Sequence, residues 1–142
     1  MSFLSSLTNT FTPSSTSSPN SIVEREEKPF RELYSLEKRK SEFKNINMKY
    51  PDRIPVIVER ASHHNLIPQI DKKKYLISHD LTMYQVLYTI RRRLRLSETQ
   101  AIFVFINNKL PPMANTLGQI YKDNKDVDGF LYITYNGEDT FG

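Results

Sequence analysis

The chain has 142 residues, of which 38% are hydrophobic, and this suits one small domain together with some unstructured sequence. It contains no cysteine, which excludes a disulfide framework, a thiolate nucleophile and a sulfur-ligated metal. The 20 Lys and Arg exceed the 16 Asp and Glu by a net charge of +4, which is modest for a nucleic-acid-binding protein. No stretch approaches the roughly 20 apolar residues of a membrane-spanning helix. A soluble, cytoplasmic protein is therefore expected.

The first 29 residues are rich in Ser, Thr, Pro and Asn, and this composition buries too little apolar surface to fold. A disordered extension is predicted over residues 1–29. Phe3, Leu7 and Phe11 recur every four residues, which would give a helix an apolar face resembling those that sense loosely packed lipid. A tail with scattered apolar residues is the preferred interpretation, because three turns of Ser-rich helix are marginal alone.

Helices are predicted in three parts of the chain after this extension. Between Lys28 and Tyr50 the sequence becomes charged and helix-forming, and two short helices are predicted, the second capped by Ser35. Asp80-Leu-Thr82 is a helix start, and apolar residues at three- and four-residue steps predict an amphipathic helix to about Arg95. One more short helix is predicted at residues 116–121.

Strands are predicted at 54–59 and 74–78, and a hairpin at 102–110 should turn at Asn107-Asn108. Residues 130–135 are mostly aromatic and β-branched with few polar residues among them, which is typical of a strand covered on both faces. The resulting order predicts an α+β β-grasp fold, in which a sheet wraps one helix and places its first and last strands side by side at the centre. The two N-terminal helices are additional to that core.

After the last strand, Asn136-Gly137 forms an easy turn, and an acidic, polar run ends on Gly142. A terminal glycine has no side chain to obstruct an enzyme that must reach its carboxylate. The carboxylate of Gly142 is therefore a candidate reactive group.

A series of short motifs runs in one register from about Lys28 to Gly142, apart from about one extra residue in the 61–70 loop. The motifs are Tyr50-Pro-Asp-Arg-Ile-Pro-Val-Ile-Val-Glu59, Asp71-Lys-Lys-Lys-Tyr-Leu76, Asp80-Leu-Thr82, Ile90-Arg-Arg-Arg93, Asn107-Asn108, Pro111-Pro112 and Phe130-Leu-Tyr-Ile133. Together they closely resemble the autophagy ubiquitin-like modifiers, the family that includes microtubule-associated light chain 3 and the GABA-receptor-associated protein.

The resemblance implies a ubiquitin-like domain over residues 30–135, a flexible conjugation tail over residues 136–142, and a protein that is a substrate rather than an enzyme. Members of this family are joined through a C-terminal glycine to phosphatidylethanolamine by ubiquitin-type activating and conjugating enzymes, and a cysteine protease deconjugates them. Phe141-Gly142 matches that terminus. The implied location is the cytoplasm, and the autophagosomal or vacuolar membrane after lipidation. No cofactor other than the covalently attached phosphatidylethanolamine is expected.

The family also docks cargo receptors through peptides that carry an aromatic residue, two spacers and an aliphatic residue, added along the edge of the second strand. By residue matching, the aromatic pocket is expected at Glu42, Ile46, Pro55, Ile57, Lys74, Leu76 and Phe130. The aliphatic pocket is expected at Tyr75, Ile77, Leu81, Val86 and Thr89. Acidic residues flanking the peptide would meet Arg53, Lys72 and Lys74.

Two departures from the family pattern change the expectation for this chain. Val86 and Thr89 stand where relatives usually carry bulkier apolar groups, so the aliphatic pocket is expected to be wider and more polar. Tyr34-Ser35-Leu36 stands where relatives have a proline-containing connection between the two N-terminal helices. The angle of the first helix is therefore expected to differ from that in relatives.

A rival hypothesis rests on three basic clusters, residues 38–40, 72–74 and 91–93, which would suit a tubulin- or nucleic-acid-binding module. Under the family reading, microtubules are a candidate partner and no nucleic acid is expected. Purely structural roles are the alternative for two of these clusters. Residues 72–74 would be a charged sheet edge that discourages aggregation. Residues 91–93 lie late in a helix, where the helix dipole favours cations. His63, His64 and His79 lack the spacing of a zinc site, and no arrangement typical of an enzyme is visible.

Overall fold

The computed structural model describes residues 28–61 and 67–137 of the chain. The predictions for residues 1–27 and for Gly142 fall outside the described residues, so the division into extension, domain and tail stays a prediction. The helices of the described part are α2 (Phe30–Leu33), α3 (Leu36–Lys49), α4 (Met83–Arg93) and α5 (Leu117–Asn124). The strands are β1 (Arg53–Arg60), β2 (Lys74–Ser78), β3 (Phe103–Phe105) and β4 (Leu131–Asn136).

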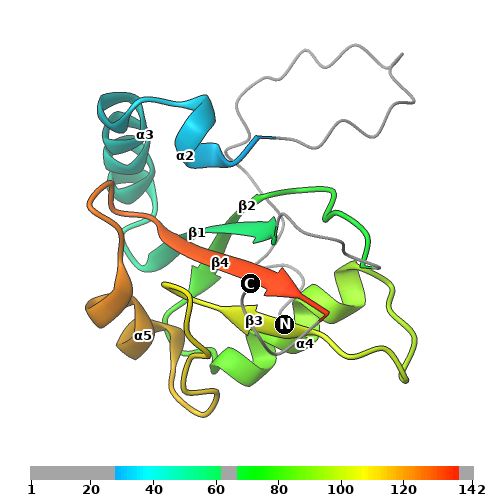
Figure 1. Cartoon of the computed structure of the whole chain (residues 1–142). Helices are drawn as coiled ribbons and strands as arrows, with labels where there is room; N and C mark the ends of the chain where they lie inside the picture. The colour runs from blue at the N-terminus through cyan, green and yellow to red at the C-terminus, as the bar shows by residue number, and fades with distance from the viewer. Residues whose placement is uncertain (1–27, 62–66, 138–142) are drawn as a thin grey trace.

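The strands form one mixed sheet in the order β2-β1-β4-β3. The two central strands, β1 and β4, run parallel, with Val56 opposite Leu131, and each outer strand pairs antiparallel with its inner neighbour. The first and last strands therefore lie side by side at the centre, which confirms the predicted α+β, ubiquitin-like fold. α2 and α3 lie on one side of the sheet and α4 on the other (Figure 1).

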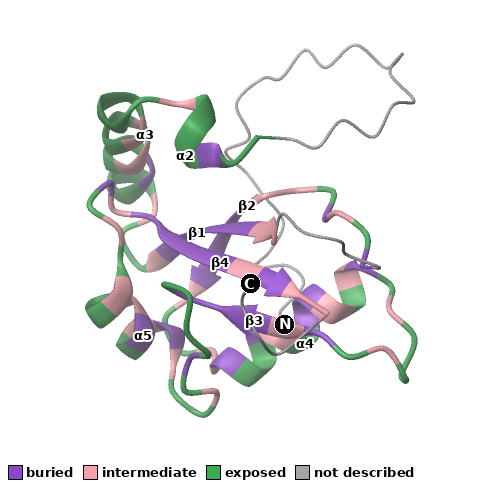
Figure 2. Ribbon diagram, in the orientation of Figure 1, coloured by how far each residue is buried: buried purple, intermediate pink, exposed green. Residues whose placement is uncertain are grey.

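Each face of the sheet has its own apolar core, because successive side chains of a strand point to opposite faces. On the α4 side, Ile54, Val56 and Val58 of β1 pack with Met83, Val86 and Ile90 of the helix. On the other side, Ile57 packs with Phe30, Ile46, Leu76, Phe130 and Tyr132. Figure 2 shows the sheet buried along most of its length.

Side-chain caps fix where the helices begin. Ser35 caps α3 as predicted, and its hydroxyl accepts from the backbone N–H of Lys38 at 3.2 Å. The predicted helix start at Asp80-Leu-Thr82 is confirmed, because Thr82 is the N-cap of α4 and forms a capping box with Gln85. α4 ends at Arg93, two residues before the predicted end, and Arg95 is left-handed at φ 56°.

The predicted hairpin at 102–110 is correct in its turn and wrong in its length. Asn107 and Asn108 adopt φ of 51° and 63°, the left-handed geometry that asparagine tolerates. The outgoing arm makes only the isolated bridge between Ile106 and Lys109. It stops there because Pro111 and Pro112 lack the N–H donors that a strand needs. β3 instead pairs with β4.

Candidate functional site

β2 is an edge strand, and its only partner within the described residues is β1. The backbone groups along its outer side can therefore receive a further strand, which is a common way for a domain to bind an extended peptide. The residues predicted for the two pockets divide between the faces of this strand. Lys74 and Leu76 lie on the α3 side, and Tyr75 and Ile77 lie on the α4 side.

The residues predicted for the aromatic pocket lie where α3, β1, β2 and the segment before β4 meet. Ile46, Ile57, Leu76 and Phe130 belong to one cluster, and Pro55 is buried beside them in β1. Ile57 and Phe130 are completely buried, so these two residues serve the core as well as any site. An open hollow of about 390 Å³ lies along α3, and of the predicted residues it is lined by Glu42 and Ile46.

Sequence reasoning missed Phe30 at this site. The Phe30 ring lies edge-on to the Phe130 ring, with centroids 5.5 Å apart, and only 2% of Phe30 is exposed. It therefore covers the cluster from the α2 side. The signal that could have found it is the position of Phe30 in α2, since a helix of one turn contributes little to a domain unless it buries such a residue.

Lys74 closes the space between β2 and α3. Its ammonium forms an ion pair with Glu42 and lies 5.1 Å from the centre of the Phe30 ring and 5.8 Å from that of Tyr34. The side chain of Lys74 is only 10% exposed. A ring that entered between β2 and α3 would have to move this ammonium, which could then bind an acidic group on the incoming chain.

The residues predicted for the aliphatic pocket lie between β2 and α4. Tyr75, Ile77, Val86 and Thr89 are buried, and Leu81 is partly buried. The Thr89 hydroxyl donates to the Gln85 carbonyl at 2.9 Å, so it is already bonded within α4. The Tyr75 hydroxyl donates to the Lys72 carbonyl, and burial raises the pKa of Tyr75 above its ordinary value.

The three cations predicted for acidic flanks differ in their surroundings. Arg53 begins β1 opposite Ser78 and is half-buried. Lys72 is half-buried just before β2, and Lys74 is held by Glu42 as described. Lys72 and Lys74 both lie beside the β2 edge, where such a flank would pass.

A buried carboxylate fixes α3 over the sheet. Asp128, only 1% exposed, accepts from the Arg39 guanidinium at 2.6 Å, from the Phe130 N–H at 2.8 Å and from the Tyr132 hydroxyl. Burial raises the pKa of Tyr132, and the hydrogen bond to Asp128 raises it further.

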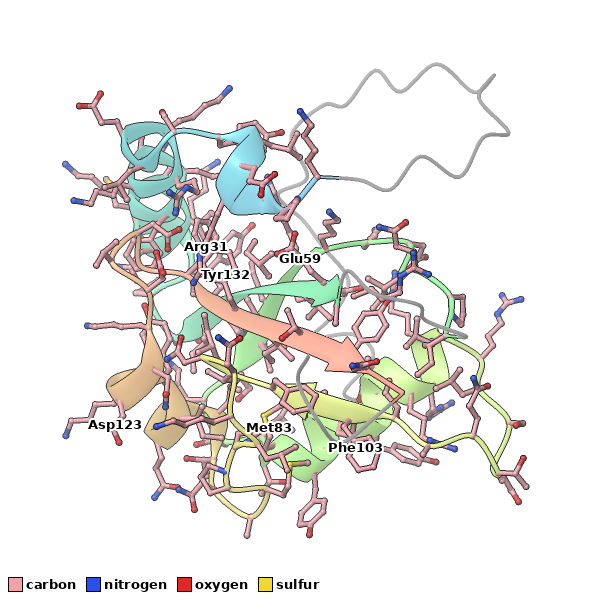
Figure 3. The ribbon with its side chains drawn as sticks, viewed as in Figure 1. Arg31, Glu59, Met83, Phe103, Asp123 and Tyr132 are labelled. Carbon is pink, nitrogen blue, oxygen red and sulfur yellow. The ribbon has the colours of Figure 1, made fainter. Side chains whose placement is uncertain are left out.

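A second set of contacts ties α2 to the same region. Arg31 of α2 stacks on the Tyr132 ring at 3.8 Å, as Figure 3 shows, and pairs with Asp126 at 2.7 Å. Sequence reasoning missed this network, because Arg39 and Asp128 are 89 residues apart.

Most of the chain matches a known protein family and individual members of it. Residues 38–142 match the family described as "Autophagy protein Atg8 ubiquitin like". The chain belongs to this family. Autophagy-related protein 8c of Arabidopsis thaliana is 56% identical over 113 residues, which cover 80% of this chain and 94% of that protein. Autophagy-related protein 8A of Oryza sativa subsp. japonica is 54% identical with the same coverage. Autophagy-related protein 8 of Candida glabrata is 50% identical over 80% of this chain and 95% of that protein.

The basic clusters of this Atg8-family chain are largely engaged in its own fold. Lys73 pairs with Glu59 at 3.4 Å, and Arg93 pairs with Asp71 at 3.1 Å. Arg91 donates to the carbonyls of Ser97, Glu98 and Gln100, which holds the loop after α4. These contacts favour structural roles for most of the cationic residues over the rival hypothesis of a basic binding module.

In the described ranges, 28–61 and 67–137, no three His, Cys, Asp or Glu side chains are grouped as a metal site would require. No helix in those ranges is long and apolar enough to cross a membrane.

Proposed function

We propose that this chain, an autophagy ubiquitin-like modifier by family, is conjugated through Gly142 to phosphatidylethanolamine and docks cargo receptors at the edge of β2. In this proposal it is the substrate of ubiquitin-type activating and conjugating enzymes and of a deconjugating cysteine protease, and not itself an enzyme. It moves from the cytoplasm to the autophagosomal or vacuolar membrane when lipidated.

The observation that carries the docking proposal is the division of the candidate residues between the two faces of an edge strand. In an extended peptide, residues three positions apart point to opposite faces. A peptide paired with β2 would therefore direct its aromatic residue toward α3 and an aliphatic residue three positions later toward α4. That spacing matches the apolar clusters beside Leu76 and beside Ile77.

Support for conjugation comes from the C-terminal end of the sheet. β4 is a central strand that is buried along most of its length and ends at Asn136, and six residues follow it in the sequence, ending on Gly142. A strand held between two neighbours is a firm support for a chain end that an enzyme must grasp. The family supplies the chemistry, an amide between the glycine carboxylate and the headgroup amine.

Docking is tested by titrating a peptide with an aromatic-x-x-aliphatic core and acidic flanks. Lys74→Ala should weaken binding by roughly 1–3 kcal/mol, because it removes the cation that faces both the pocket and the acidic flank. Lys109→Ala is the matched control, since Lys109 is an exposed lysine in the turn after β3. Equal affinities for the two variants would remove Lys74 from the site.

Conjugation is tested by incubating the full chain with the activating and conjugating enzymes, ATP and phosphatidylethanolamine vesicles, followed by intact-mass analysis. The expected product is heavier than the chain by one phospholipid less one water. Gly142→Ala should abolish it while leaving peptide affinity unchanged. A lipid adduct on the Gly142→Ala chain would overturn the assignment of Gly142.

A further inference from the structure

The outer face of α4, turned away from the sheet, exposes two aromatic rings and one arginine, and a second arginine is exposed just after the helix. Tyr84 and Tyr88 are one helical turn apart and are 61% and 62% exposed. Arg92 follows one turn later, with its guanidinium carbon 5.9 Å from the centre of the Tyr88 ring. Arg95 is exposed directly after the helix. Tyr84, Tyr88, Arg92 and Arg95 are called the α4 strip below.

The arginines of the α4 strip are not neutralised by ion pairs within the described residues. Neither Arg92 nor Arg95 has an acidic partner within the described residues, whereas the neighbouring Arg93 is paired with Asp71. Tyrosine side chains, which carry a polar hydroxyl on an apolar ring, suit the boundary between lipid headgroups and acyl chains. A guanidinium group can bind two oxygens of one phosphate group at once. The side chains of the strip therefore fit an anionic lipid surface.

The C-terminal end of the α4 strip lies near the place where the chain leaves the domain. The end of α4 is tied through Arg93 to Asp71, and the neighbouring Ile70 N–H donates to the hydroxyl of Tyr135 near the end of β4. Five residues separate Gly137 from the end of Gly142, and they span at most about 18 Å when extended. A lipid on Gly142 would hold this end of the domain within that distance of a bilayer.

We propose that the α4 strip is the surface on which the domain rests against an anionic membrane; the inference depends on the proposed attachment of lipid to Gly142. α4, which carries most of the strip, and the helices α2 and α3 lie on opposite sides of the sheet (Figure 1). The candidate aromatic pocket beside α3 thus faces away from the bilayer, and membrane contact leaves it open to a receptor.

The absence of cysteine and tryptophan from the sequence permits a test that needs no conjugating enzyme. The full chain with Gly142→Cys is coupled to maleimide-phosphatidylethanolamine in vesicles, and Tyr88→Trp supplies the single fluorescent reporter. Brominated acyl chains should quench this tryptophan in vesicles that contain phosphatidylserine, and added salt should relieve the quenching. A tryptophan at Leu33, which is 51% exposed on α2, is the matched reporter and should stay unquenched.

The charges are tested in the same vesicles. Arg92→Gln with Arg95→Gln should lower the equilibrium between contacting and free orientations by about 30-fold, since a cation near an anionic surface contributes about 1 kcal/mol. Lys40→Gln with Lys44→Gln makes the same change of charge on exposed positions of α3 and should leave quenching unaltered.

Three results would overturn the proposal: a Tyr88→Trp reporter that is not quenched, equal quenching of the two reporters, or equal effects of the two charge variants. A fourth is an uncoupled chain whose binding to single-stranded RNA depends on Arg92 and Arg95 while its coupled form gives no quenching. Because the coupling is chemical, these results are independent of whether enzymes conjugate Gly142. A failed conjugation reaction would contradict the proposed function alone.

Discussion

Replacing Asp128 by alanine should destabilise the domain severely, because it leaves a buried cation without its main partner. The Asp128 side chain is fully buried and the Arg39 side chain is 12% exposed, and their charged atoms are 2.6 Å apart. Removing one partner of such a pair typically costs 3–5 kcal/mol. Arg39 keeps a second, longer ion pair with Asp126 at 3.6 Å. The free energy of unfolding should therefore fall by about 3 kcal/mol, the lower end of that range.

The measurement is urea unfolding followed by circular dichroism, with the free energy extrapolated to water. Asp128→Leu combined with Arg39→Met should be more stable than Asp128→Ala alone, because it leaves no unpaired charge in the interior. A loss below about 1 kcal/mol for Asp128→Ala, the size expected of an exposed ion pair, would refute the reasoning. So would a double variant less stable than Asp128→Ala.

Three further predictions concern stability, each read from the unfolding midpoint. Gly129→Ala should lose roughly 1–3 kcal/mol or more, since Gly129 has φ 100° and an added Cβ would meet the Phe43 ring at 2.4 Å; a stability within error of wild type would contradict this. Thr82→Ala should lose about 1 kcal/mol through the capping box with Gln85, whereas Thr82→Ser should not. Burial raises the pKa of Tyr135 to about 12, so the unfolded state releases its proton first and stability should fall between about pH 10 and 12. Tyr135→Phe should make that fall shallower, and an unchanged slope would contradict it.

Local signals in the sequence were sufficient for the order of the elements. The caps at Ser35 and Thr82, the paired asparagines at 107–108 and the prolines at 111–112 each act within a few residues, so they mark boundaries without knowledge of the fold. Asp80 and Thr82 are both residues that can cap a helix, and the reciprocal bonds with Gln85 select Thr82.

The candidate site was less accessible to sequence reasoning. The two faces of β2 follow from strand alternation, and the pocket residues came from family resemblance. The cover supplied by Phe30, the Lys74–Glu42 ion pair and the anchoring of α3 by Asp128 depend on contacts between distant segments. Such contacts leave no periodic signal in the chain. The exposure of Tyr84 and Tyr88, in contrast, agrees with the predicted amphipathic helix, whose apolar steps leave both residues on the other face.

The strand order β2-β1-β4 has a mechanical consequence for the proposed modifier. If a receptor is held at β2 and a lipid at the end of β4, tension between cargo and membrane passes through the two ladders that join β2 to β1 and β1 to β4. Each ladder includes five residue pairs, and a pull directed along the strands loads their hydrogen bonds together rather than one after another. The sheet is thus suited to resist the component of that tension that runs along its strands.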